Sequence, residues 1–501
     1  PDASPRERGL GPPAAVDGDS ANAVAKALPP GATPGCEAPV AQENGSLYQV
    51  CWPEAWNGEL VVYAHGYVSP FEEELSIPPE AKALADLVLP LGFAFAATSY
   101  PDNGLVVKEG VDDLDALVAY FTREYAAADR VYLTGASEGG LIAALAVERH
   151  PDVFDGGLAT CGPYGSFSEQ MNWFGDARVA FDYFFPGVLP RWTADDPRTP
   201  PAVIGNWEAT YAPRIRRALR QRPKATRQFL RVTGLPVDAD DTVAVAQAVL
   251  GVLEYSVFAT NDAMDRLGGQ PYDNTDRSYA GSADDRRLNR EIERFEADPA
   301  ALQEMEAFYR TSGELTVPLV TMHTTGDPIV PIWQQTLYRR KLAESGSAGL
   351  HSALPILRYE HCNFEDSELL AGFALLVYRV RGFPLADAVF ALSTRAEQRH
   401  FQQRRVVRGV LRGRKGDPRG ASRAKREREA DGRREEQRLP AVSFRFDDRL
   451  FHATTPVHAR PARSPHAPPG RLHARCGFEC GPIRNARPRG RAGGRRRHRA
   501  R

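Results

Sequence analysis

The stretch VYLTGASEGGLI, residues 131–142, decides the fold of this chain. An apolar, β-branched run leads into Gly135-Ala136-Ser137-Glu138-Gly139, and an alanine-rich pattern typical of a helix follows it. The stretch therefore predicts a strand, a sharp turn and a helix, with Ser137 at the apex. Small residues two positions before and after such a serine let strand and helix approach closely, and the turn lifts the hydroxyl clear of the sheet.

Strands and helices alternate on both sides of this turn. Residues 60–64, 92–98 and 157–161 are continuous apolar runs of the buried-strand type, and the strand pattern resumes at 319–323 and 356–359. Amphipathic helical patterns cover residues 80–89, 112–125 and 366–381. Because strands that are apolar throughout are buried on both faces, the sequence predicts an α/β fold with a mainly parallel sheet flanked by helices.

The alternation of strands and helices is interrupted between the strand patterns at 157–161 and 319–323. Residues 165–314 show helical patterns, several prolines and many aromatic residues, which predicts a mostly helical cap inserted into the sheet domain. The predicted core is therefore discontinuous. Its parts are residues 35–164 and 315–394, preceded by a flexible leader at 1–34 that is rich in Pro, Ala and Gly.

Charge divides the chain sharply, although its net charge is only −1. Residues 395–501 hold 31 Lys and Arg against 10 Asp and Glu, whereas residues 1–394 hold 32 against 54. A basic segment attracts phosphate, so a nucleic-acid-binding tail is one interpretation. The tail has neither interleaved aromatic residues nor a recognisable binding module. A disordered extension, or translation of a shifted reading frame, is therefore the preferred interpretation, and no nucleic-acid partner is expected.

Six cysteines are few for 501 residues. Cys36 and Cys51 flank a short segment and could form a local disulfide. For Cys161 and Cys362 the sequence does not decide between buried free thiols and disulfide-bonded cysteines. An exported location, secreted or periplasmic, is favoured, with the cytoplasm as the alternative. No apolar run approaches the roughly 18–20 residues that cross a bilayer, so no membrane span is expected. The oligomeric state is not predicted.

Candidate catalytic residues lie at three strand-to-helix junctions. A serine nucleophile needs a base, and the base needs an acid to orient it. On this kind of sheet the expected chain order is serine, then Asp or Glu, then His. Asp327 follows the predicted strand at 319–323, and His361 follows the one at 356–359. Residue type, order and placement together predict Ser137, Asp327 and His361 as a catalytic triad.

Competing interpretations of these residues are less specific. Asp327 could simply cap the next helix, and Asp366 is a poorer acid because it falls inside the closing helix. His323 is expected as a strand residue and His150 as the last residue of a helix, where the helix dipole favours it. Only five histidines precede the tail, which leaves few rival bases.

An oxyanion hole is expected beside the serine. One donor should be the backbone N–H of Glu138, which follows the nucleophile, and the other the backbone N–H of Tyr67 in the loop after the strand at 60–64. The Tyr67 ring could stack on a substrate acyl group or pack against the cap. No catalytic role is expected for the Glu138 side chain.

From about Gly45 to Pro384 the chain resembles the α/β-hydrolase superfamily. The resemblance rests on His65-Gly66, Gly135-Ala136-Ser137-Glu138-Gly139, Asp327-Pro328-Ile329-Val330-Pro331 and His361-Cys362. It implies similarity to bacterial esterases, lipases or peptidases with a long insertion before the acid. Too few residues precede the nucleophile for the propeller of prolyl oligopeptidases.

The His361-Cys362 pair also resembles tannase and feruloyl esterase sequences. In those proteins a cysteine beside the histidine bonds one beside the nucleophile. Ala136 precedes Ser137 here, so that bridge cannot form at the same place, and tannase is not the expected activity.

The expected function is hydrolysis of carboxylic esters through an acyl-enzyme intermediate, on a small-molecule or polymeric ester. The alternative enzymatic function is that of an amidase or peptidase with the same triad. A non-catalytic scaffold used for binding is a third hypothesis. No cofactor and no metal are predicted. The tail residues His473, Cys476 and Cys480 are a poor match to a zinc site.

Overall fold

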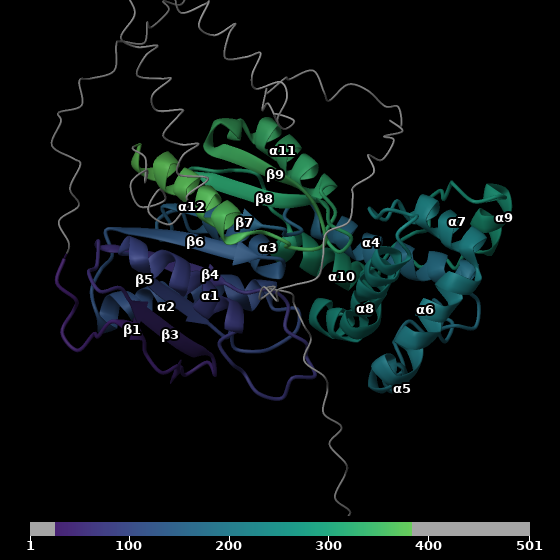
Figure 1. The fold of residues 1–501 in the computed structure, drawn as a ribbon, viewed down its shortest axis with the longest axis horizontal. Coiled ribbons are helices and arrows are strands. Elements are labelled where there is room, and N and C mark those ends of the chain that lie inside the picture. Colours follow the sequence, from purple (N-terminus) through teal and green to yellow (C-terminus); the bar gives the residue numbers. More distant parts are fainter. Residues whose placement is uncertain (1–25, 383–501) are drawn as a thin grey trace, which may run out of the picture. The chain divides into compact units, whose positions relative to one another are not determined.

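A single mixed sheet organises the computed structural model, which describes residues 26–382 (Figure 1). Along the sheet the order is β1 (Gly35–Cys36), β3 (Leu47–Trp52), β5 (Ala94–Thr98), β4 (Glu59–Ala64), β6 (Arg130–Ala136), β7 (Gly156–Thr160), β8 (Leu319–Gly326) and β9 (His351–Tyr359), with β2 (Val40–Ala41) paired to β3. The pairs from β5 to β9 are parallel, and β3 is antiparallel to β5. The predicted α/β fold with a mainly parallel sheet is confirmed.

Both faces of the sheet are covered by helices. In β4 every residue is buried; Leu60 and Val62 pack in one hydrophobic cluster, while Val61 and Tyr63 pack in another. The first cluster includes side chains from α2 (Val107–Glu124), α3 (Glu138–Arg149) and α11 (Trp333–Ser345), and the second from α1 (Pro79–Val88) and α12 (Asp366–Arg381). This two-sided burial explains why the central strands read as unbroken apolar runs.

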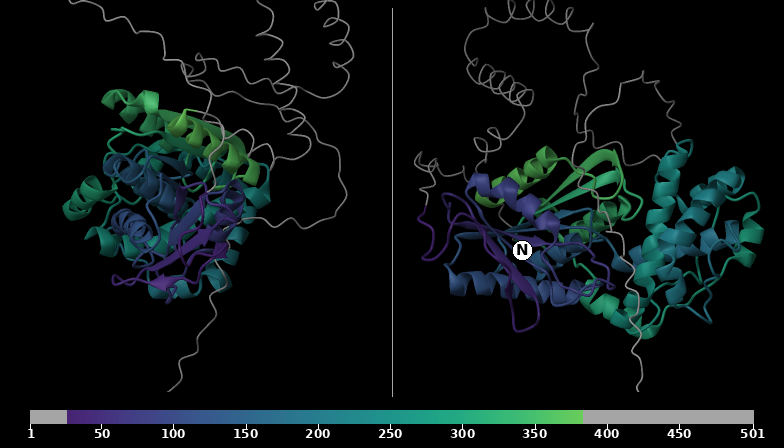
Figure 2. Two further views of the ribbon diagram at one scale, coloured as in Figure 1. Left: turned by 90° about the vertical axis from the view of Figure 1, so that its left-hand side faces the viewer. Right: turned by 60° about the horizontal axis from the view of Figure 1, so that its bottom comes forward.

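Between β7 and β8 the chain forms a group of helices, for which we keep the name cap. They are α4 (Phe167–Phe184), α5 (Pro201–Gly205), η2 (Trp207–Tyr211), α6 (Ala212–Gln221), α7 (Pro223–Thr233), α8 (Thr242–Leu267), α9 (Asp285–Glu291), α10 (Pro299–Glu304) and η3 (Met305–Tyr309). Figure 2 shows most of these helices, in teal, beside the sheet and its covering helices. The cap has a hydrophobic core of its own, in which Phe181, Phe185 and Phe229 are fully buried.

One cap helix bears on the prediction that no apolar run could cross a membrane. Helix α8 is long and apolar enough to do so by length and composition, so that prediction needs correction for residues 242–267. In this structure α8 packs against α4 and α6 and buries Val249 and Leu253 in the cap core. It is the central helix of the cap.

Several element boundaries differ from the predictions. The helix expected after Asp327 is α11, for which no bounds were predicted, and β9 begins earlier than expected, at His351. The short helical turns η1 (Leu89–Leu91) and η4 (Ala348–Leu350) were missed. The predicted leader at 1–34 is wrong in its last part. Lys26 donates its backbone N–H to the Trp56 carbonyl oxygen at 2.7 Å and its ammonium to Asp129 at 2.6 Å, which ties this segment to the core. The last part of the predicted core, residues 383–394, and the basic tail lie outside the described residues.

Candidate active site

Ser137 lies on a strained turn between β6 and α3. Its φ is 58°, in the left-handed region that non-glycine residues rarely adopt. The flanking glycines are required by space: a Cβ on Gly135 would lie 2.0 Å from the Gly139 carbonyl oxygen, and one on Gly139 would lie 2.0 Å from that of Ala64. The strand, the helix and the neighbouring strand β4 therefore meet backbone to backbone at this turn, as the G-x-S-x-G pattern predicts.

Ser137, His361 and Asp327 form a continuous hydrogen-bonded chain. His361 Nε2 lies 2.9 Å from Ser137 Oγ, and His361 Nδ1 lies 2.7 Å from Asp327 Oδ2. The carboxylate is fully buried, and its Oδ1 accepts the backbone N–H groups of Ile329 and Val330, each at 2.9 Å. An ionised Asp327 accepts from Nδ1–H, which leaves Nε2 as the acceptor of the serine proton. The structure thus brings together the three residues predicted as a triad.

His323 stands behind this chain, on β8. Its Nε2 lies 2.6 Å from the Val330 carbonyl oxygen and 3.8 Å from Asp327 Oδ2, and its Nδ1 lies 3.2 Å from the Tyr164 hydroxyl. Burial lowers the pKa of His323, opposed by the nearby Asp327 carboxylate, so the ring is neutral at pH 7. His323 is therefore a strand residue that holds the loop after Asp327 by a hydrogen bond to Val330. This agrees with the prediction that it is not the base.

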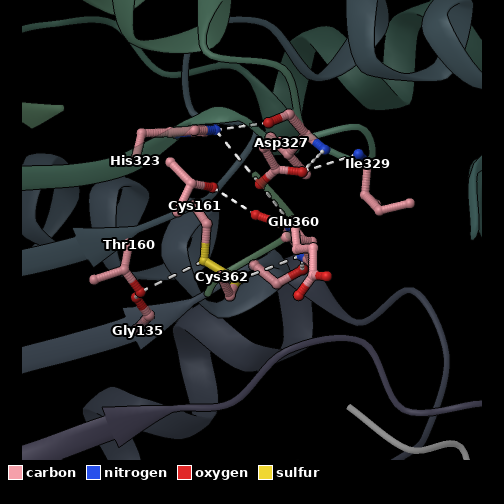
Figure 3. The surroundings of a disulfide bond; sticks show 12 residues. Gly135, Thr160, Cys161, His323, Asp327, Ile329, Glu360 and Cys362 are labelled. Carbon is pink, nitrogen blue, oxygen red and sulfur yellow. Dashed lines mark hydrogen bonds and ion pairs between the residues drawn. A yellow bond between two sulfur atoms is a disulfide. The ribbon is translucent and has the colours of Figure 1, made fainter. Parts of the chain in front are cut away.

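A disulfide joins Cys161, directly after β7, to Cys362, directly after His361 (Figure 3). The free-thiol interpretation of these cysteines is therefore wrong. Cys161, Glu360 and Cys362 have φ values of 45°, 78° and 49°, so the backbone on both sides of the bridge is in the left-handed region. The bridge joins the residue after His361 to the end of β7, the strand that pairs with β6. A cysteine at position 136 would have offered a partner on β6 itself, but that position is an alanine.

The local disulfide that Cys36 and Cys51 could form is present as well. Cys36 and Cys51 face each other across the antiparallel pair of β1 and β3 and are bonded. Among the described residues, one group of side chains is close enough to hold a metal ion: Cys161, His361 and Cys362. Because its two sulfur atoms are bonded to each other, this group offers no thiolate ligand.

The two residues predicted to supply the oxyanion donors line the same cavity as Ser137. Glu138 is the first residue of α3, so its N–H belongs to the first turn, whose amides have no partner within the helix. Tyr67 follows β4, and its hydroxyl donates to Asp262 Oδ2 of α8 at 3.2 Å. The Tyr67 ring lies 6.1 Å from that of Tyr255, also on α8. The ring therefore packs against the cap, which was one of its two predicted positions.

The Glu138 side chain has an unexpected environment. One carboxyl oxygen, Oε1, accepts the Val106 N–H at 2.8 Å, whereas the buried Oε2 has no hydrogen-bond partner among the described residues. Burial raises the pKa of Glu138 to about 8, and the nearby Asp262 and Glu109 carboxylates add to the shift, so the group is mostly protonated at neutral pH. The sequence pattern did not indicate this burial.

Ser137 opens into a narrow cavity of about 90 Å³ between core and cap, large enough for more than one water molecule. The cavity wall is almost wholly apolar. Its residues include Tyr67, Leu105, Phe167, Met171, Phe174, Trp192, Tyr255, Ala259, Ala263, Gln270, Ile329 and Val330. Half of these come from α4 and α8, far from Ser137 in sequence, so no local pattern pointed to them. Of the many aromatic residues in the inserted segment, Phe167, Phe174 and Trp192 line the cavity, while Phe181 and Phe185 belong to the cap core.

Comparison with known proteins gives one family match. The family described as serine aminopeptidase, S33, matches residues 106–230, about a quarter of the chain. No curated protein matches.

Solved structures with a similar fold include an esterase of Pyrococcus furiosus, at 14% identity over 68% of this chain and 90% of that one, with a TM-score of 0.34. A monoacylglycerol lipase of Paleococcus ferrophilus is similar at 14% identity over 65% and 95%, with a TM-score of 0.31. An acylaminoacyl peptidase of Pyrococcus horikoshii is similar at 11% identity over 66% and 38%, with a TM-score of 0.33. Likenesses this distant say nothing about substrate.

The sheet order and the strained turn at Ser137 are those of an α/β-hydrolase fold. The family match at residues 106–230 is consistent with this fold.

Proposed function

We propose that this chain hydrolyses carboxylic esters with Ser137 as the nucleophile, His361 as the general base and Asp327 as its orienting acid. The observation that carries the proposal is the hydrogen-bonded chain of these three residues at the mouth of an apolar cavity. An apolar wall favours an acyl or aromatic group over a charged peptide segment, because burying charge without a partner is costly. The substrate is accordingly a small-molecule or polymeric ester with an apolar part, and the proposed chemistry uses no cofactor.

In the proposed mechanism, His361 Nε2 takes the proton of Ser137 Oγ as the oxygen attacks the ester carbonyl carbon. The Tyr67 and Glu138 N–H groups donate to the resulting oxyanion. His361 then gives the proton to the departing alcohol, leaving an acyl group on Ser137. Water, deprotonated by His361, attacks this acyl-enzyme and releases the acid, while Asp327 stabilises the imidazolium in both steps.

The direct test is Ser137→Ala. Ester hydrolysis should fall by at least about 10⁴-fold, because the oxyanion donors alone supply little of the rate. The thermal unfolding temperature should stay near that of the wild type, and a fluorophosphonate should label residue 137 of the wild type alone. Retention of esterase activity by the folded variant would sink the proposal.

A second candidate is an aminopeptidase that uses the same three residues. It is favoured by the description of the matching family and by Glu138, which lines the cavity and whose Oε2 has no hydrogen-bond partner within residues 26–382. A substrate ammonium group there would favour the ionised carboxylate. Matched p-nitrophenyl esters and p-nitroanilides, each with a free or acetylated amino group, separate the two: a preference for free-amine anilides that Glu138→Gln abolishes supports the peptidase.

We also propose that the protein works in an oxidising compartment, secreted or periplasmic. Support comes from two disulfides in a chain with six cysteines, because reducing compartments keep such thiols unpaired. Detection of both bridges by non-reducing peptide mapping of protein from its native source is the test; free thiols at these positions would contradict it.

A further inference from the structure

One polar residue that lines the cavity, Gln270, has a side-chain nitrogen that is not used by anything described so far. Gln270 follows α8, is 5% exposed and lines the same cavity as Ser137. Its Nε2 is buried and has no hydrogen-bond partner among the described residues. A buried donor left without a protein partner costs on the order of 1–3 kcal/mol, which is unusual for a native side chain.

The orientation of the Gln270 amide is determined by its neighbours. Its Oε1 accepts the backbone N–H of Tyr272 at 3.1 Å. Turning the amide over would place its NH₂ against that N–H, donor against donor, so Nε2 is the group that is left over. The Gln270 backbone is held too: its N–H donates to Asp298 Oδ2 at 2.7 Å, and its carbonyl oxygen accepts from the Asp298 N–H at 2.8 Å.

Other polar side chains in the wall have their hydrogen bonds within the protein. Gln170 Nε2 donates to the Ile329 carbonyl oxygen at 2.8 Å, and Trp192 Nε1 to that of Pro197 at 2.6 Å. Ser256 Oγ donates to the Leu253 carbonyl oxygen of its own helix at 2.8 Å. Among the lining residues, the buried atoms without a partner in the described protein are Gln270 Nε2 and Glu138 Oε2, and Glu138 adjoins the nucleophile.

We propose that Gln270 determines specificity by donating a hydrogen bond from Nε2 to an oxygen atom in the apolar part of the substrate. The preferred ester would then carry an ether, carbonyl or hydroxyl oxygen remote from the scissile bond, within an otherwise hydrocarbon acyl or alcohol group. In an apolar cavity such an oxygen normally lowers binding, because it loses its water. A fixed hydrogen-bond donor such as Gln270 Nε2 would replace the lost water, so an oxygen atom at the matching position would raise binding. This inference rests on the proposed ester hydrolysis and names the kind of ester.

The test is a set of p-nitrophenyl esters of straight-chain acids in which one methylene is replaced by an ether oxygen or a ketone, moved stepwise along the chain. For the wild type, one position should raise kcat/KM about five- to tenfold over the all-carbon ester of the same length. Gln270→Met, which keeps the length of the side chain, should abolish that preference.

Two further variants guard against a purely structural effect. Gln270→Glu keeps an oxygen for the Tyr272 N–H and replaces the free donor with an acceptor, so the oxygenated ester should fall below the all-carbon one. Ser256→Ala removes a hydroxyl whose proton is already used within α8, so the wild-type preference should persist. The inference is overturned if no oxygen position is preferred by the wild type, or if the preference survives in both Gln270 variants.

Binding without turnover distinguishes this inference from the proposed function. In Ser137→Ala, displacement of a fluorescent fatty-acid analogue by the same esters reports recognition alone. If the wild type cleaves no ester while Ser137→Ala shows an oxygen preference that Gln270→Met removes, esterase activity is wrong and the role of Gln270 stands. If esters are cleaved with no oxygen preference in either measurement, the proposed esterase activity stands and the role of Gln270 is wrong.

Discussion

At the scale of the residue, Glu138 carries two different tasks. Its backbone N–H begins α3 beside Ser137, while its carboxyl group is buried and one oxygen has no hydrogen-bond partner in the described part of the chain. Donation by the backbone N–H, as proposed for the oxyanion, needs no particular side chain, so the buried carboxyl group is a separate feature. Burial of an acid couples its proton to folding, because the folded state holds the proton at pH values where the unfolded chain releases it.

Glu138→Gln should therefore change how stability depends on pH. The pKa of Glu138 is about 8 in the folded protein against 4.5 for the free group, so its contribution to stability is full below about pH 4.5 and is lost as the pH rises to about 8. Each pH unit in that interval costs up to about 1.4 kcal/mol. The variant should gain stability over the wild type at pH 8 and little at pH 5, measured by chemical unfolding at both.

A suitable control is Glu54→Gln, because Glu54 is exposed. This variant should differ little from the wild type at either pH. An equal gap between Glu138→Gln and the wild type at pH 5 and pH 8 would show that the carboxyl is ionised in the folded protein.

At the scale of the element, the loop after β9 is held by the bridge to the end of β7. The Cys161–Cys362 bond fixes the residue next to His361 to the strand that neighbours β6. The Thr324 hydroxyl donates to the Glu360 carbonyl oxygen at 2.7 Å and holds the same loop from β8. Two neighbouring strands thus determine where the imidazole points, which the loop sequence alone does not.

Replacing Cys161 and Cys362 together by serine should lower kcat about tenfold or more, because a misplaced base costs rate even when substrate still binds. The matched control is the double serine variant of Cys36 and Cys51, a bridge between the edge strand β1 and its neighbour β3. Each variant should lose about 2–4 kcal/mol of stability. Steady-state kinetics and thermal unfolding of both variants give the comparison; equal kcat losses would mean that the first bridge serves stability alone.

At the scale of the whole described molecule, Asp262 of α8 ties the cap to two loops of the core. Its Oδ2 accepts from the Tyr67 hydroxyl at 3.2 Å and from the Leu105 N–H at 2.7 Å. Arg266, one turn further along α8, forms an ion pair with Asp102 in the second loop. The cap therefore reaches the loop that bears the proposed oxyanion donor, so cap and catalytic geometry should be coupled.

Asp262→Ala should lower kcat about 10- to 100-fold, because Tyr67 and its backbone N–H lose their anchor. Asp265→Asn is the matched control on the same helix: Asp265 is exposed and pairs with Arg198, so its loss should leave the kinetics unchanged. Steady-state kinetics of both variants on one ester decide the matter. A wild-type kcat in Asp262→Ala would mean that the core positions Tyr67 without the cap.

The sequence by itself determined the α/β architecture, the turn at Ser137 and the order of the three candidate catalytic residues. The physical reason is that these depend on local patterns: apolar runs for buried strands, glycines where backbones touch, and polar residues directly after strands.

Only the tertiary structure decided the partner of Cys161, the burial of the Glu138 carboxyl and the cavity wall with Gln270. Each depends on segments far apart in sequence. Cys161 and Cys362 are 201 residues apart, and Gln270 comes from the end of a cap helix. Local sequence patterns do not indicate such neighbours, because they are set by how distant strands, loops and cap helices pack together. The pattern around Ser137 indicates how the proposed reaction proceeds, whereas residues of both core and cap form the cavity that would receive the substrate.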